Sequence, residues 1–224
     1  MIALYSWIGA SLAVSGLLVA LLAWMHQSPR FASHRIKQGM PMRVSPTNRA
    51  LMSGLTGTLS LLMALGIPYV GYDVLFTDAA PTWWWGIVQS VGILLVYDFL
   101  YYFLHRLMHV KAIMPIAHYA HHRAVNPSAV ESFYQHPIEV VAGMSLFFSV
   151  VWLASPLHPH VFGALFFVYT TINVFVHSGL QFRTPLLAPI DFLTRKHHAH
   201  HLVDGRKNYA SLTPFWDMMF GTSL

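Results

Sequence analysis

Long apolar runs alternate along the chain with shorter polar segments. The first three runs are each long enough to cross a bilayer core, which takes about 20 residues of helix. The last two are shorter and are separated by a brief turn, which is typical of a hairpin. The pattern predicts an all-α membrane bundle with about four or five membrane segments, one pair of them a short hairpin. The runs cover residues 2–25, 50–72, 83–104, 137–155 and 161–176.

The first run has the length of a membrane span and lacks the basic segment that opens a signal peptide. We therefore expect it to be retained as a span. The chain has 224 residues, which is the length of one domain. We expect a single membrane domain over residues 1–224.

Composition agrees with a membrane protein. Hydrophobic residues make up 55% and charged residues 9% of the chain, too few charges to cover a water-soluble globule. There is no cysteine, which excludes disulfides, iron–sulfur clusters and thiolate metal sites. The tryptophans at 83–85 open the third run and are typical of an interfacial aromatic belt.

The basic residues predict the orientation in the membrane. With three full spans and one hairpin, all 13 Lys and Arg residues fall on one side, whereas Asp73, Asp78 and the turn at His158 fall on the other. The positive-inside rule makes the basic side cytoplasmic and the N-terminus external. The net charge of +5 therefore reflects topology, and no nucleic-acid partner is expected.

Histidine is the unusual residue type, with 15 copies, most of them in three clusters on the predicted cytoplasmic side. Residues three or four positions apart share a helix face, so we expect the ring nitrogens within a cluster to converge. A further candidate, His177, ends the fifth run. The clusters are His105 and His109; His118, His121 and His122; and His197, His200 and His201 with the additional His198.

One such cluster alone could be a solvated polar face, but three clusters on one membrane side favour metal binding. Eight cluster histidines with His177 as a ninth exceed the needs of one ion and suit two. Imidazole donors suit zinc, copper, iron or nickel, and the spacing does not choose among them. We expect His136 and His198 to support the ligands from outside. His158 and His160 lie on the opposite side.

Three further polar residues lie at helical spacing from histidines. Asp98 is two turns before His105 and could orient that ring or pair with Arg106. Glu139 follows His136 by three positions, and Asn173 precedes His177 by four. The alternative for each is a polar residue that is satisfied locally near the membrane interface.

These motifs resemble the fatty acid hydroxylase superfamily, also called the sterol desaturase family, of membrane di-iron enzymes. The resemblance covers about residues 98–222 and leaves 1–97 as N-terminal spans. Some relatives have a second histidine where Asn173 stands, which leaves one coordination position in doubt. Besides the clusters, the matching pieces are His136-Pro137-Ile138-Glu139, Asn173 to His177, Asn208-Tyr209, Trp216-Asp217 and Phe220-Gly221-Thr222.

The resemblance implies two iron ions, O₂ as co-substrate and oxidation of a membrane lipid. Hydroxylation of a fatty acyl, sterol or related lipid is the leading expectation, and desaturation at the same site is the alternative. No side chain is expected to act as nucleophile or base. The implied ligands are His105, His109, His118, His121, His122, His177, His197, His200 and His201.

Electrons must come from a separate donor, such as a reductase, a ferredoxin or a cytochrome b5-like carrier. The chain has no cysteines for a ferredoxin centre, no GxGxxG motif and no haem domain. We expect the donor to dock on the basic face. Because no organelle retention signal is present, we expect a bacterial inner membrane.

Two other classes of protein remain as alternatives. A metal transporter or metal sensor would place polar ligands within the spans, and metal-dependent flux in proteoliposomes would reveal transport. A haem b electron carrier would use single histidines on facing spans and would show a Soret band. The lipid, the position oxidised and the oligomeric state do not follow from the sequence.

Overall fold

The computed structural model describes residues 1–36, 44–203 and 205–224, and these are almost entirely helical apart from loops and two isolated bridges. The longer helices are α1 (Ile2–Gln27), α2 (Pro46–Val70), α4 (Trp83–Met108), α7 (Pro137–Leu153), α8 (Pro159–Val176) and α9 (Ala188–Leu202). The short ones are η1 (Pro29–His34), α3 (Tyr72–Leu75), α5 (Met114–Ala117), α6 (Tyr119–His122), η2 (Ala129–Phe133), η3 (Pro185–Leu187) and α10 (Phe215–Met219).

Each predicted apolar run forms one helix, which confirms the all-α membrane bundle. Four helices, α1, α2, α4 and α8, are long and apolar enough to cross a membrane. The fifth, α7, has 17 residues and is apolar but shorter. A short turn joins it to α8, as the predicted hairpin requires, and the ring of Phe147 on α7 stacks on that of Tyr169 on α8 with centroids 4.5 Å apart. The protein is an integral membrane protein.

Helix starts in this chain share a local signal. Pro46, Pro137 and Pro159 each occupy the first helical position, where the missing N–H is not needed. The residue before each proline caps the helix. His136 Nδ1 accepts a bond from the Ile138 amide at 3.3 Å, so this histidine acts locally as a helix cap.

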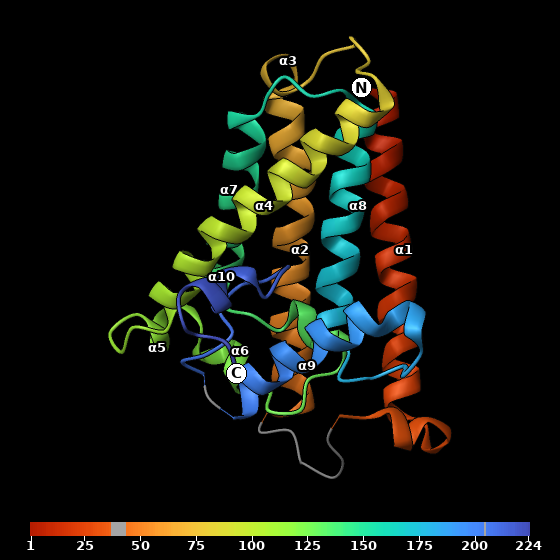
Figure 1. Ribbon diagram of the computed structural model, residues 1–224. Helices are drawn as coiled ribbons and strands as arrows, with labels where there is room; N and C mark the ends of the chain where they lie inside the picture. Colours follow the sequence, from red (N-terminus) through yellow and green to blue (C-terminus); the bar gives the residue numbers. More distant parts are fainter. Residues whose placement is uncertain (37–43, 204) are drawn as a thin grey trace.

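The bundle is held by α1 along α8, α2 along α7, and α4 across both hairpin helices (Figure 1). The α1–α8 contact depends on a glycine. A Cβ atom on Gly163 would lie 2.3 Å from Cγ of Trp7, so any larger residue would push the helices apart. Trp7 Nε1 also donates to His160 Nδ1 at 2.7 Å. This pair lies at the end of the bundle remote from the histidine clusters.

The two ends of the bundle differ in content. One end, drawn at the bottom of Figure 1, collects α5, α6, α9, α10 and the C-terminus, while the N-terminus and α3 lie at the other. The Thr77 amide donates to the Leu157 carbonyl at 3.0 Å, which ties together the two loops at that second end. The described Lys and Arg residues belong to segments at the histidine end; Lys37 and Arg43 fall outside the described residues.

Candidate metal centre

Nine histidines meet where α4, α6, α8 and α9 come together. Their ligand nitrogens form two groups, and within each group these atoms lie within 4.8 Å of one another. His177 joins the second group, because its Nε2 lies 3.4 Å from Nε2 of His121. The first group is His105, His109, His118, His122 and His200, and the second is His121, His197 and His201.

The first cluster stays together, whereas the second and third clusters divide between the two groups, so the expectation that all rings of one cluster converge is wrong for these two. In the second cluster His118 and His122 belong to one group and His121 to the other. The third cluster does the reverse, with His197 and His201 together and His200 apart. On a helix, positions i and i+4 almost eclipse, whereas adjacent positions diverge by about 100°. Histidines at adjacent positions in the sequence therefore belong to different groups.

The two groups adjoin. The rings of His122 and His201, one from each group, stack with centroids 4.5 Å apart. Short α6 begins after His118, which stands as its N-cap, and α4 ends with His109 as its C-cap. These helix ends place side chains from remote parts of the chain around one buried volume.

Backbone carbonyls orient four of the rings. Because a carbonyl oxygen only accepts, the facing Nδ1 must carry the proton, and Nε2 then presents a lone pair. The bonds join Nδ1 of His105 to the Tyr209 carbonyl at 2.7 Å, of His121 to Tyr134 at 3.1 Å, of His177 to Asn173 at 2.7 Å, and of His200 to Lys207 at 2.6 Å.

The Nε2 atoms face one another at distances that suit a shared cation. His105 and His118 are 2.9 Å apart through Nε2, His122 and His200 are 3.1 Å apart, and His201 is 3.1 Å from His121. Where both Nε2 atoms of such a pair carry lone pairs, they repel unless a positive charge lies between them. Ligands about 2.1 Å from one ion at a right angle would be about 3 Å apart. The donor set therefore fits metal ions.

Burial keeps these rings neutral, which is the form that binds metal. Removal from water lowers the pKa of His122 to about 3. The same cause lowers the pKa of His109 to about 4 and that of His177 to about 4. All three rings are therefore neutral at neutral pH, with one ring nitrogen free to bind a metal ion.

Glu139 contacts the first group directly. Its Oε1 lies 2.9 Å from Nδ1 of His118, and its side chain is 4% exposed. A carboxylate beside the outer nitrogen of a ligand histidine fixes the ring and raises its basicity. Glu139 therefore contacts a histidine, as expected, and that histidine is His118.

Asp98 does not contact a histidine or Arg106, and both partners expected for it are wrong. Its carboxylate accepts bonds from the amides of Ser211, Leu212 and Thr213 at 2.8, 2.6 and 3.0 Å. A buried carboxylate needs such donors, and the chain folds its C-terminal loop over α4 to supply them. Asp98 thereby holds the loop that carries the Tyr209 carbonyl.

A second buried carboxylate, for which the sequence pattern predicts no role, secures the same loop. Asp217 accepts from the amides of Tyr209 and Ala210 at 2.7 and 3.0 Å. It also pairs with Lys196 Nζ at 3.0 Å, and burial lowers the pKa of this lysine while the carboxylate opposes the shift. The Asn208-Tyr209 and Trp216-Asp217 motifs mark this loop in the sequence.

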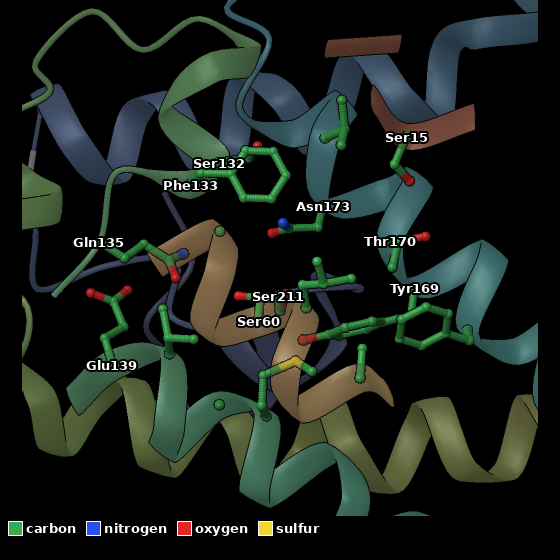
Figure 2. A pocket seen from close by; sticks show the side chains of 18 of the residues that line it. Ser15, Ser60, Ser132, Phe133, Gln135, Glu139, Tyr169, Thr170, Asn173 and Ser211 are labelled. Carbon is green, nitrogen blue, oxygen red and sulfur yellow. The ribbon is translucent and has the colours of Figure 1, made fainter. Parts of the chain in front are cut away.

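Two of the remaining candidates lie outside both groups. His198 is buried on α9 between ligand candidates but belongs to neither group, and His136 caps α7. Asn173 supplies its backbone carbonyl to His177 and turns its side chain into a cavity (Figure 2).

This cavity of about 150 Å³ lies within the bundle and adjoins the histidines. It is enclosed by α1, α2, α4, α7 and α8, and its walls mix apolar and hydroxyl side chains (Figure 2). A small space of about 30 Å³ beside it is lined by five of the nine histidines. The two spaces share Tyr101, Gln135, Asn173 and Ser211 as lining residues. The cavity therefore leads to the candidate metal centre.

Known proteins share the region that carries these features. The model of the family described as fatty acid hydroxylase matches residues 90–222, more than half of the chain. Methylsterol monooxygenase 1 of Rattus norvegicus is 33% identical over 66% of this chain and 50% of its own length. Delta(7)-sterol 5(6)-desaturase erg3B of Aspergillus fumigatus is 28% identical over 88% of this chain and 56% of its own.

A third relative, very-long-chain aldehyde decarbonylase GL1-11 of Oryza sativa subsp. japonica, is 30% identical over 63% of this chain and 54% of its own. The chain thus spans about half the length of the curated relatives it matches. No solved structure matches significantly.

Proposed function

Since the chain belongs to the fatty acid hydroxylase family, we propose that it oxidises a C–H bond of a membrane lipid with O₂ at a histidine-bound pair of iron ions. Hydroxylation is the leading reaction. The observation that carries the proposal is the approach of buried histidine Nε2 atoms to about 3 Å of one another in two adjoining groups.

The proposed ligands follow the two groups. One ion would be held by five histidines and the other by four, with His177 completing the second set. The first set is His105, His109, His118, His122 and His200, and the second is His121, His177, His197 and His201.

When bound, the iron pair supplies oxygen activation and the oxidation of carbon. The chain's own residues would hold the ions and orient the ligand rings. Carbonyls keep the proton of each supported ring on Nδ1, and Glu139 steadies His118. Apolar side chains of α2 and α8, such as Leu61 and Phe166, line part of the cavity beside the site and would limit the access of bulk water. Side chains need not move a proton, because the redox centre performs the chemistry.

The membrane setting supports a lipid substrate and an external electron donor. Exposed basic side chains, including Lys111 and Arg195, lie at the histidine end, where an acidic reductase or small carrier could dock. By the positive-inside rule this end is cytoplasmic. The relatives named above come from eukaryotes, so a bacterial membrane stays a prediction from the sequence.

The metal content of the purified protein tests the proposal. Protein from iron-57-supplemented cells should contain about two irons per chain, and Mössbauer spectra should show a coupled pair. Two zinc ions per chain would support the two ligand groups. The native ion would then have to be identified by reconstitution with iron. One metal or none per chain would contradict the ligand assignment.

Desaturation is a second candidate, supported by the similarity to the Aspergillus fumigatus desaturase over most of the chain. Hydroxylation leaves an alcohol and desaturation an alkene, which differ in mass by one oxygen atom and two hydrogens. Lipids from cells with and without the protein, compared by mass spectrometry under ¹⁸O₂, should show an ¹⁸O-labelled alcohol. An unlabelled alkene would instead establish the desaturase.

A further inference from the structure

A groove between α4 and α8 lies toward the end of the bundle that is remote from the histidine clusters. Its volume is about 490 Å³, and its lining is almost entirely apolar. Exposed side chains such as Ile87, Val91 and Ala164 line it, so it faces the membrane. Along α4 it runs from Trp83 to Leu94, which is about 16 Å of helix and close to half of the roughly 30 Å thick hydrocarbon core. The groove therefore has the length of an acyl chain in one leaflet.

Two histidines line this groove where α8 begins, and their hydrogen bonds fix the position of the proton on each ring. The His160 amide donates to Nδ1 of His158 at 3.3 Å, and Trp7 Nε1 donates to Nδ1 of His160 at 2.7 Å. A nitrogen that accepts a bond carries no proton, so each ring carries its proton on Nε2. The centroids of the two rings are 4.9 Å apart. This end of the groove therefore presents two neighbouring N–H donors, which suit the oxygens of a phosphate group.

The charged side chain nearest in sequence to this end of the groove is a carboxylate. Asp78 is exposed, and its loop is held against the start of α8 because the Thr77 amide donates to the Leu157 carbonyl at 3.0 Å. No Lys or Arg is among the described residues that line the groove, and the N-terminal ammonium donates to the Tyr72 hydroxyl at 2.7 Å. A phosphate bound by the two imidazoles thus has no protein cation beside it. A ligand that carries its own ammonium would instead meet the carboxylate of Asp78.

From the length of the groove, its two imidazole donors and the nearby carboxylate, we propose that α4 and α8 bind one zwitterionic phospholipid with an ammonium headgroup. An acyl chain fills the groove, the phosphate accepts bonds from His158 and His160, and the ammonium pairs with Asp78. The groove shares no lining residue with the cavity or the small space beside the histidine groups. The bound lipid is therefore a structural ligand that bridges two spans, and the inference does not depend on the proposed function.

Native mass spectrometry of the full chain in detergent, titrated with one lipid at a time, tests the proposal. The probes are phosphatidylethanolamine, phosphatidylcholine and phosphatidylglycerol with the same acyl chains. One phosphatidylethanolamine should bind roughly tenfold tighter than phosphatidylglycerol, the worth of one hydrogen bond between charged groups. Phosphatidylcholine should fall between them, because its quaternary ammonium attracts a carboxylate but donates no hydrogen bond. Equal affinity for phosphatidylethanolamine and phosphatidylglycerol would overturn the proposal.

Variants assign the bound lipid to the groove. Ala164→Phe fills the groove and should abolish tight binding, whereas Ala10→Phe makes the same change at an exposed position of α1 outside the groove and should leave binding unchanged. His158→Asp keeps a side chain that can cap α8 but replaces the donor with a negative charge, and should weaken the binding of all three probes. Asp78→Lys should reverse the preference toward phosphatidylglycerol. That gain cannot result from misfolding.

Two further outcomes would contradict the assignment. Equal lipid binding by the Ala164→Phe and Ala10→Phe variants would place the lipid elsewhere on the protein. A dimer that dissociates in the Ala164→Phe variant would assign the groove to a second copy of the chain. Metal content tests the proposed function separately, and it should be unchanged in the Ala164→Phe and Asp78→Lys variants because neither residue lines the histidine space.

Discussion

At the scale of single residues, five of the nine proposed ligand rings are oriented by the group that contacts their outer nitrogen. The Lys207 carbonyl holds His200 from Nδ1, and Nε2 of the same ring faces His122. Glu139 lies against the outer nitrogen of His118 in the same way. His198, two positions before His200, is buried but lies in neither group. Position on α9 therefore separates a proposed ligand from a neighbour of the same type.

Substitution of His200 and of His198 tests whether the two residues differ in metal binding. His200→Ala should lower the metal content from about two ions per chain toward one, because the first set loses one of its five proposed donors. His198→Ala should keep both ions. Metal analysis after dialysis against a weak chelator makes the measurement. Equal metal loss in the two variants would show that the division into groups is wrong.

At the scale of elements, α9 and the loop that follows it form one unit. Lys196 lies under the loop, where Nζ contacts Asp217 and the carbonyls of Ala210 and Thr213. Asn208, at a positive φ of 59°, donates from its side chain to the Lys196 carbonyl at 3.1 Å. The carbonyl of Tyr209 is thereby presented to His105. A buried ion pair outside both histidine groups thus positions a proposed ligand.

Removal of one partner of this buried pair should destabilise the protein. Asp217→Ala leaves Lys196 buried and uncompensated, at a cost of about 3–5 kcal/mol. Asp73→Ala, exposed at the opposite end, should change stability by less than about 0.5 kcal/mol. Thermal unfolding in detergent compares them. The double variant Lys196→Met with Asp217→Leu should recover much of the loss; if it does not, the pair is not the cause.

At the scale of the whole molecule, the bundle separates its polar chemistry from its apolar spans. Histidines, basic segments and the C-terminal loop gather at one end, and Asp73, Asp78 and the His158 turn lie at the other. The cavity lies between the helices of the bundle and adjoins the histidines. The proposed lipid substrate would therefore lie within the bundle, beside the proposed metal centre.

The absence of native cysteine makes this orientation measurable by labelling. Asp78→Cys should react in intact cells with a membrane-impermeant maleimide, because the positive-inside rule places it outside. Lys111→Cys should react only after permeabilisation. Both positions are exposed loops at opposite ends of the bundle. The reverse result would place the histidine end outside and contradict the predicted orientation.

Much of the element pattern could be predicted, because apolar runs and proline starts act over a few neighbouring residues. The run at 161–176 needed only its length and composition to become α8. The nine proposed ligands were also visible, since histidines seldom cluster without reason. Glu139 could be identified only as a residue near a histidine, because its contact with His118 crosses 21 positions of chain.

The sequence by itself determined the helices, the membrane character and the set of histidines, since these depend on local period and composition. The tertiary structure alone decided which histidine joins which group, because that depends on how α4, α6 and α9 approach one another. It also places the carboxylate of Asp98 against the amides of residues 211–213, more than 100 positions away, and it places Gln135 in the wall of a cavity. Such contacts carry no periodic signal, because packing between distant segments creates them.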